Sequence, residues 1–458
     1  MDLNQFLTEY DDSLGGDLNV DPLGLQVIWS AFGQDIFRYR VSSISNDVRN
    51  YTLNLFHHCL IKDLVEDERL RLSPQLGKTF ERLDTLSFKT ACLIYLENLF
   101  TYSMIAHQDD AGVDTGGVLG SAKARKRWGN KSEGAGNPSL LFGDTDKSYI
   151  LVRQPLLGVS GRYKTPLVQM GFFDKNYHYS PQSAPLWKQA HALIKQVRPL
   201  SLLYRALRGH MEEVLSQPSK APQVAFNQVP AAIKSGYVEA YKSPARVGSY
   251  AREFWLGVTH LDRGAAGALY RVLASAIGGS SKAKPQTIFT EAQVDSALSE
   301  QERRQIDRVR QLEPFLAELD LLFTLMLVNK QQTLDQVAAL WAKYGRGPQV
   351  LRDTATDLEA LLSQLSGTGK RRLQQLLKLA HLIDAKSQLH QLLTYHNGVM
   401  QDRGQSPWLR LSADGTLKLD VRSRREPDPE DRPRGHWVNH YYIPQFQNLL
   451  QGLLGGAA

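Results

Sequence analysis

The residues best suited to metal chemistry lie near the C-terminal end of the sequence. Asp414 and Asp420 fall in a predicted hairpin, where carboxylates can hold Mg²⁺ in a nuclease. No lysine stands at the expected place beside Asp420, so that set is incomplete. His436 and His440 would share a face on a helix, but no third zinc ligand is near them in sequence. These gaps favour a protein without a metal, a cofactor or a catalytic residue.

Two further patterns imitate functional motifs. Residues 367–370 read Gly-Thr-Gly-Lys, like part of a phosphate loop, but the first glycine is missing and Arg371 stands where Ser or Thr is required. His57, His58 and Cys59 offer metal-ligand atoms, but neighbouring residues of a helix point in different directions. We therefore expect a helix–helix turn at 367–370 and core packing at 57–59.

A cluster of basic residues beside a tryptophan is the stronger functional pattern. Residues 122–128 read Ala-Lys-Ala-Arg-Lys-Arg-Trp, and residues 162–164 read Arg-Tyr-Lys. Lysine and arginine neutralise phosphates, arginine reaches guanine edges, and aromatic rings stack on bases or sugars. The alternative for residues 122–128 is a short solvated helix. The candidate nucleic-acid contacts are Lys123, Arg125, Lys126, Arg127, Trp128, Arg162, Tyr163 and Lys164.

The positive charge of the chain is concentrated in its middle third. The net charge is +7 over 458 residues, but residues 1–150 carry 15 Lys/Arg and 21 Asp/Glu, a balance of −6. Residues 151–288 carry 18 Lys/Arg and 6 Asp/Glu, a balance of +12. Such segregation can attract a polyanion or dock on an acidic protein. A nucleic-acid surface requires that these cations converge on one face.

Composition indicates a cytoplasmic protein. An apolar content of 42% is enough for sizeable cores. The two cysteines, Cys59 and Cys92, provide no disulfide framework, which favours a reducing compartment. The sequence after Met1 lacks the pattern of a secretory signal. The most apolar window, 90–106, is short for a bilayer and contains Glu97, so we expect no membrane partner.

Hydrophobic residues recur at helical spacing through most of the chain, which predicts a mainly α, multi-helical fold. Two exceptions are expected. Residues 408–421 form two alternating runs around Asp-Gly, the signature of a β-hairpin. Residues 148–180 suggest a winged-helix-like α+β unit, with a strand at 149–152, a helix at 162–170 capped by Ser160, and an exposed hairpin at 176–179. In such a unit, residues 162–164 would begin the helix that enters the DNA major groove.

Glycine-rich and basic stretches divide the predicted helices into domains. We expect an N-terminal helical domain (1–108), a basic Gly/Ser-rich linker (109–147), a basic helical domain (148–278), a short linker (279–289) and a C-terminal helical domain with the hairpin (290–458).

Three patches of the sequence carry a resemblance. Residues 21–24 with 28–33, residues 161–166, and the corner from Arg403-Gly404 to Pro407-Trp408 resemble uncharacterised proteins of bacterial defence and mobile-element operons. The resemblance implies a cytosolic subunit that works with other proteins against foreign DNA. It assigns a function to no individual residue.

Three hypotheses follow. The first is a non-catalytic nucleic-acid-binding subunit of a bacterial multi-protein assembly, acting on duplex DNA in antiviral or anti-plasmid defence. The second is a scaffold whose basic third docks an acidic protein. The third is a metal-dependent nuclease that uses Asp414 and Asp420 with His436 and His440. The basic middle favours the first, and the incomplete metal sets place the third last.

Overall fold

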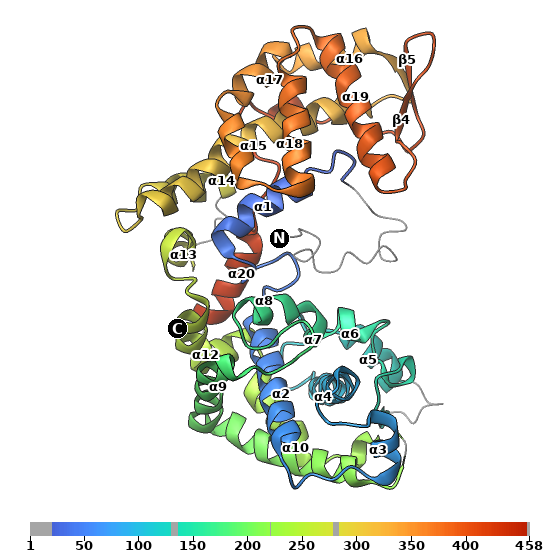
Figure 1. Ribbon diagram of the computed structural model, residues 1–458, viewed down its shortest axis with the longest axis vertical. Coiled ribbons are helices and arrows are strands. Elements are labelled where there is room, and N and C mark those ends of the chain that lie inside the picture. The colour runs from blue at the N-terminus through green and yellow to red at the C-terminus, as the bar shows by residue number, and fades with distance from the viewer. Residues whose placement is uncertain (1–20, 130–135, 220, 278–283, 456–458) are drawn as a thin grey trace. The chain divides into compact units, whose positions relative to one another are not determined.

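The computed structural model describes residues 21–129, 136–219, 221–277 and 284–455, and it is mainly α-helical (Figure 1). The described strands form one two-stranded and one three-stranded sheet. The predicted fold class and the C-terminal hairpin are confirmed. The chain forms two compact units. Unit 1 comprises residues 1–37, 263–272 and 278–443, and unit 2 comprises 38–262, 273–277 and 444–458.

Unit 2 is a helical assembly with one small antiparallel sheet, in which β1 (Ser139–Leu141) pairs with β2 (Gln223–Ala225). Its helices are α2 (Val48–Glu66), α3 (Pro74–Phe80), α4 (Leu86–Ala106), α5 (Ser121–Trp128), α6 (Gln154–Leu157), α7 (Val159–Arg162), α8 (Lys164–Gln169), α9 (Ala184–Gln196), α10 (Arg198–Ser216), α11 (Ala231–Tyr241) and α12 (Pro244–Thr259).

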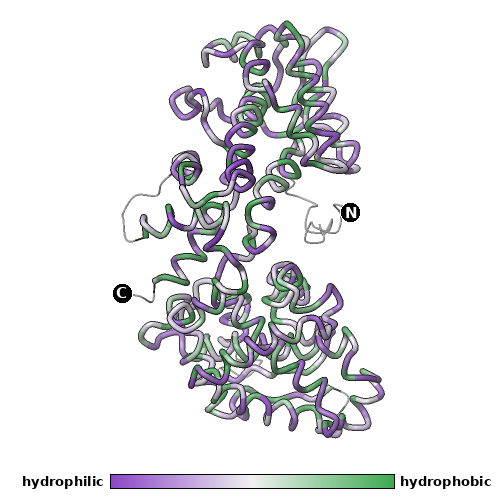
Figure 2. The backbone as a smooth tube through the Cα atoms, turned by 60° about the vertical axis from the view of Figure 1, so that its left-hand side comes forward, coloured by the Kyte–Doolittle hydropathy of each residue, from purple (hydrophilic) through white to green (hydrophobic). Residues whose placement is uncertain are grey.

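The core of unit 2 is built on α2 and α4, which are buried on nearly every face. Most other helices alternate apolar and polar stretches, as Figure 2 shows along the chain. Helices that are apolar all round pack inside, and helices with one apolar stripe pack around them. Asp47 caps α2, because its Oδ1 accepts the amide of Arg49 at 2.8 Å. The expected core packing of His57, His58 and Cys59 is confirmed.

The winged-helix prediction for residues 148–180 is wrong. No strand forms at 149–152 or 176–179. The helix predicted at 162–170 is present in shorter form as α8, which Ser160 does not cap, and two further short helices, α6 and α7, precede it. The cause is a buried carboxylate on α4. Glu97 Oε1 accepts the amide of Ser160 at 2.6 Å, and Glu97 Oε2 accepts Gln154 Nε2 at 3.3 Å. A Cβ at Gly158 would lie 2.3 Å from Glu97 Oε2, so this turn requires glycine.

The aromatic run after α8 is packed into unit 2 and does not form an exposed hairpin. Tyr177 is buried and Tyr179 is half-buried, and both rings lie against His58. The buried Lys89 donates to the carbonyl of Tyr177 at 2.8 Å, and its Nζ lies 4.7 Å from the centre of the Tyr179 ring. This cation–π contact and the aromatic pairs explain why alternating polar and aromatic residues are held inward.

Unit 1 is a second helical assembly, centred on the long helix α15. The C-terminal half of α15, from Leu312 to Met326, is almost wholly buried. Residues 367–370 form the first turn of α18 and not a phosphate loop. The helices within unit 1 are α1 (Gln26–Phe37), α14 (Pro285–Gln293), α15 (Glu300–Met326), α16 (Leu334–Lys343), α17 (Pro348–Ala355), α18 (Gly367–Ala380) and α19 (Ala385–Asp402). Two more helices, α13 (Gly264–Ala276) and α20 (Ile443–Leu454), complete the described set.

The predicted hairpin becomes part of a three-stranded antiparallel sheet in unit 1. Strands β4 (Leu409–Leu411) and β5 (Thr416–Leu419) pair as expected around the Asp-Gly turn. A third strand, β3 (Gln331–Thr333), adds to the far side of β5 in the order β3-β5-β4. The sequence around β3 is polar and short, so periodicity gave no signal for it.

The turn at Asp21–Gly24 is bound by α18 and α19. The hydroxyl of Tyr395 donates to Leu23 O at 2.8 Å, and Arg372 Nη1 donates to Gly24 O at 3.0 Å. His396 contacts Pro22 O through Nδ1 at 2.9 Å and accepts the amide of Trp408 on Nε2 at 2.9 Å. Two of the three patches that carry the resemblance therefore meet in one place, with His396 between them.

A single buried carboxylate organises the rest of unit 1. Glu313, on α15, accepts the amides of Val438 and Asn439 on Oε1 at 2.6 and 2.8 Å. Its Oε2 accepts Trp29 Nε1 at 2.7 Å and the Tyr441 hydroxyl at 2.8 Å. Burial raises the pKa of Glu313 to about 7, and the four donors oppose that rise. Glu313 thereby joins α15 to α1 and to the irregular segment before α20.

We expect Glu313→Ala to lower the free energy of unfolding by about 3 kcal/mol, because it leaves several buried donors without an acceptor. Glu300→Ala, an exposed position on the same helix whose side chain pairs with Arg304, is the control and should cost less than about 1 kcal/mol. Urea unfolding of the three proteins measures both. Equal losses in the two variants would contradict the role given to Glu313.

Candidate nucleic-acid interface

The predicted basic cluster forms the helix α5 of unit 2. Lys123, Arg125 and Lys126 are exposed and Arg127 is half-buried, while Ala124 faces the interior. Lys123, Lys126 and Arg127 are spaced i, i+3 and i+4, so they lie on one face of the helix. Among the residues that the structure describes, these three have no carboxylate partner. The basic residues on the last turn of α5 also interact favourably with the helix dipole; they are Arg125, Lys126 and Arg127.

Gly120 sets the start of α5. It has φ 84°, a left-handed conformation that favours glycine, and an added Cβ would lie 3.3 Å from side-chain atoms of Ile150 and Leu151. The helix therefore begins against the segment that precedes α6. Its far end is held by Trp128, whose ring lies 5.5 Å from that of Phe226 in an edge-to-face arrangement.

Two of the predicted contacts on α5 have structural partners. Trp128 is half-buried between Phe226 and Tyr102, so its ring anchors the helix and is not presented for stacking on a base. Arg125 Nε donates to Gln108 Oε1 at 2.8 Å, and its Nη2 donates to Thr115 Oγ1. Arg125 thus bridges α5 to the preceding loop, which leaves Lys123, Lys126 and Arg127 as the free cations of the helix.

The residues of the second predicted patch, 162–164, differ in how far they are buried. Tyr163 is only 2% exposed, and its hydroxyl accepts the amides of Asp47 and Asn46 at 3.1 and 3.4 Å. Burial raises the pKa of Tyr163 to about 12, so the phenol stays neutral. Lys164 is half-buried with its Nζ 4.7 Å from the centre of the Tyr177 ring, and Arg162 is half-buried at the end of α7. We therefore treat Tyr163 as a positioning residue and not as a surface contact.

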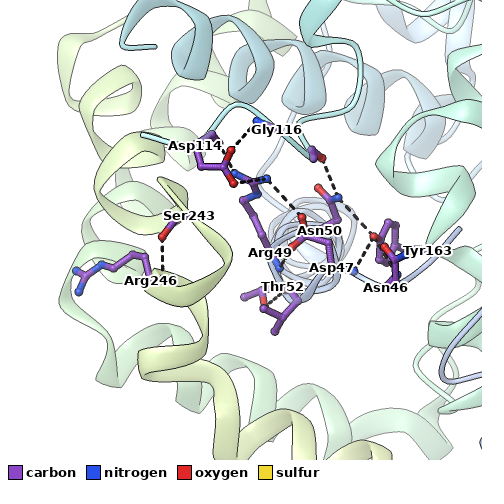
Figure 3. Close-up of polar contacts among 12 residues, drawn as sticks. Asn46, Asp47, Arg49, Asn50, Thr52, Asp114, Gly116, Tyr163, Ser243 and Arg246 are labelled. Carbon is purple, nitrogen blue, oxygen red and sulfur yellow. Dashed lines mark hydrogen bonds and ion pairs between the residues drawn. The ribbon is translucent and has the colours of Figure 1, made fainter. Parts of the chain in front are cut away.

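The N-terminus of α2 joins the two patches (Figure 3). Asn50 Nδ2 donates to Gly117 O at 3.2 Å and to the Tyr163 hydroxyl at 3.4 Å. Arg49 Nη1 donates to Asp114 O at 2.5 Å. One turn of α2 therefore holds both the loop that leads into α5 and the junction between α7 and α8.

Arg49 is the charged centre of this network. Its side chain is fully buried, and its Nη2 lies 3.4 Å from Asp47 Oδ2 and 3.9 Å from Asp114 Oδ2. Removing one partner of a buried ion pair leaves an uncompensated charge, which is far more costly than losing an exposed pair. The loop at 114–117 is therefore held in place. No sequence pattern marks Arg49, because an isolated arginine at the start of a helix is usually solvated.

The surplus cations of residues 151–288 do not converge with α5. Several have partners in unit 2, such as Arg208, which pairs with Asp67 and Glu212. Others are exposed and have no carboxylate partner among the described residues, including Lys188 and Lys195 on α9 and Arg198 and Arg205 on α10. In Figure 1, α9 lies on the other side of α2 and α4 from α5. The charge distribution therefore does not produce one basic surface around α5.

Asp63 fixes the angle between α9 and α10. Its Oδ1 lies 3.0 Å from His191 Nε2 on α9, and its Oδ2 accepts the Tyr204 hydroxyl on α10. His191 Nδ1 lies 2.8 Å from Trp187 O, so both ring nitrogens face acceptors. The hydrogen bond to Asp63 raises the pKa of His191, and burial opposes that rise. With both nitrogens engaged, His191 has no free atom for acid–base catalysis.

The candidate metal ligands do not come together. Asp420 accepts two hydrogen bonds from Arg410, one of them 2.6 Å from Nη2, and Asp414 Oδ1 accepts the amide of Thr416 at 3.0 Å. Residues 436–440 are not helical, so His436 and His440 do not share a helix face. Within the described ranges, no three His, Cys, Asp or Glu side chains are grouped to hold a metal ion.

Comparison with protein-family models, with curated proteins and with solved structures found no match to this chain. Among the described helices, none has the length and apolar character needed to cross a bilayer.

We expect two glycine substitutions in unit 2 to have opposite effects. A Cβ at Gly117 would lie 2.7 Å from Asp47 Oδ2 and 2.9 Å from Arg49 Nη2, so Gly117→Ala should lower the free energy of unfolding by about 2 kcal/mol. Gly209 lies inside α10 with open space around it, so Gly209→Ala should raise that free energy by about 0.5 kcal/mol. Chemical denaturation tests both, and a neutral Gly117→Ala would show that the network tolerates displacement.

The Asp63–His191 contact predicts a pH dependence of stability. Because folding raises the pKa of His191 above its ordinary value of about 6.5, its contribution is fully present below pH 6.5 and is lost as pH rises through the pKa of the folded protein. The difference in free energy of unfolding between the wild type and His191→Gln should therefore shrink with rising pH. In an Asp63→Asn background the same substitution should show little pH dependence, and a persistent dependence would assign the effect to Lys62, Tyr204 or Arg208 nearby.

Proposed function

We propose that this chain is a non-catalytic nucleic-acid-binding protein that binds duplex DNA through α5 of unit 2. The observation that carries the proposal is the face of Lys123, Lys126 and Arg127, three cations that have no carboxylate partner among the described residues, on a helix fixed at both ends. Phosphate is the natural partner of such a face, since each neutralised phosphate releases condensed counterions.

The rigidity of α5 supports this role. Gly120 and the loop 114–117 hold its first turn to the N-terminus of α2, and Trp128 holds its last turn. A charged surface that is already ordered loses less conformational entropy on binding than a mobile one. The cytoplasmic setting and the role in a defence assembly that the sequence suggests belong to the same proposal.

The second candidate is docking of an acidic protein on α9 and α10. Lys188, Lys195, Arg198 and Arg205 are exposed there, and Leu202 among them is 46% exposed. An apolar side chain within a basic face suits a protein partner better than a phosphate backbone. A single stoichiometric partner that co-purifies and resists nuclease treatment would favour this candidate.

Two variants with equal loss of charge separate these functions. We expect Lys123→Gln, Lys126→Gln and Arg127→Gln together to weaken duplex binding at low salt by about tenfold or more. The slope of log affinity against log salt should fall by roughly 2 to 3, because three phosphate contacts are lost. Fluorescence anisotropy with a labelled duplex over a salt series measures both quantities.

The control is the triple variant Lys188→Gln, Lys195→Gln and Arg205→Gln, which removes the same charge from α9 and α10. It should retain most of the binding and most of the salt slope. Equal losses in both triple variants would show that net charge alone drives binding, and the assignment to α5 would fail. Absence of binding by the wild type at low salt would remove the proposed function.

A further inference from the structure

A groove in unit 1, distant in sequence from the basic middle third, lies beside the edge of the three-stranded sheet. It has a volume of about 570 Å³ and is lined by β3, the two residues before it and one face of α16. The lining residues on α16 are Gln336, Ala339, Leu340 and Lys343, which are spaced i, i+3, i+4 and i+7 and so share a face. The small side chain of Ala339 leaves space above this face, and Leu340 contributes an apolar side chain to it.

The groove carries positive charge that the described residues do not neutralise. Lys330 and Lys343 line it, both are exposed, and no carboxylate is among the lining residues. The nearest acid on α16 in sequence, Asp335, is 2.8 Å from Lys386 in an ion pair. The other polar groups of the lining are the neutral amides of Asn329, Gln331 and Gln336.

The strand beside the groove has an open edge. Strand β3 lies at the outside of the sheet, and Leu419 donates to Lys330 O at 3.0 Å, so Lys330 and Gln332 are the residues bonded to β5. Gln331 and Thr333 then point their backbone groups outward. The amide of Thr333 is taken by Gln336 Oε1 at 2.8 Å, which leaves Gln331 to offer a free N–H and C=O to an added strand.

The strand is held rigidly before any partner arrives. The buried Gln332 donates through Nε2 to Leu325 O at 3.0 Å and to Met326 O at 2.9 Å, at the end of α15. They are two of the last carbonyls of α15, where the regular hydrogen bonds of the helix end, so Gln332 helps to satisfy them and fixes β3 to α15. An edge strand that is fixed in this way needs no ordering when a peptide pairs with it.

We infer that this groove binds an extended acidic segment of a partner protein. The segment adds as a strand beside Gln331, places an apolar side chain over Ala339 and Leu340, and directs carboxylates to Lys330 and Lys343. Strand addition supplies backbone hydrogen bonds, and the side-chain positions supply selectivity. The occupant is acidic because two exposed lysines border the groove and none of its walls contributes a negative charge.

The probe is a short fluorescent peptide of alternating glutamate and valine, with the glutamine–valine peptide as its neutral counterpart. We expect the acidic peptide to bind the full chain and the neutral one to bind at least about tenfold more weakly. Hydrogen exchange of the Gln331 amide should slow in the complex, because that amide becomes part of a strand pair.

Charge reversal locates the site. Lys330→Glu with Lys343→Glu should abolish binding, and Ala339→Trp should block the groove without changing its charge. Lys370→Glu with Lys378→Glu, two exposed positions on α18 of the same unit, is the matched control and should bind as the wild type does.

Three results would overturn the inference. These are no binding of the acidic peptide at low salt, equal loss in the control pair, or binding without protection of Gln331. Self-association lost on Lys330→Glu would reassign the groove to a second copy of the chain. Residues 1–20 are acidic. Tighter peptide binding after their removal would show that this segment of the chain itself, and not a partner protein, occupies the groove. None of these outcomes depends on DNA binding by α5, so the two proposals can fail separately.

Discussion

The buried guanidinium of Arg49 is the constraint on which the arrangement of unit 2 depends. A charge that is excluded from water must be surrounded by acceptors, and Asp47 together with the carbonyl of Asp114 supplies them. That requirement fixes the loop at 114–117 against the first turn of α2. The same turn holds Tyr163 through Asn50. The exposed basic helix α5 is therefore positioned by residues that do not themselves reach the surface.

The same physical solution recurs where the chain has no regular structure. Glu97 accepts the amide at Ser160 and shapes the turns between α6 and α8. In unit 1, Glu313 accepts the amides of Val438 and Asn439 and joins them to Trp29 and Tyr441. In each case a buried charged side chain on a central helix satisfies backbone groups that no helix or strand would satisfy. Irregular segments of this chain are ordered by such residues.

The two surfaces that we propose for binding differ in what they can recognise. On α5 the free groups are long cationic side chains, which suit a repeating phosphate backbone. In the groove beside β3, the free groups are two lysines, a helix face with a low floor and one open backbone pair, which suit an extended polypeptide. The two surfaces lie in different units, and we propose that one binds DNA and the other a protein partner.

The sequence by itself determined the helical class, most helix positions, the β-hairpin and the burial of His57–Cys59, because periodic apolar residues and turn signals are local properties. It marked the basic cluster at 122–128 but assigned it to a linker, where the structure forms the helix α5. Only the tertiary structure decided which charges are free. Tyr163 and Trp128 pack inside unit 2, residues 148–180 turn around Glu97 and not into a wing, and some cations of the middle third, such as Arg208, pair with carboxylates. These outcomes rest on contacts between residues tens to hundreds of positions apart, which neither spacing nor local propensity encodes.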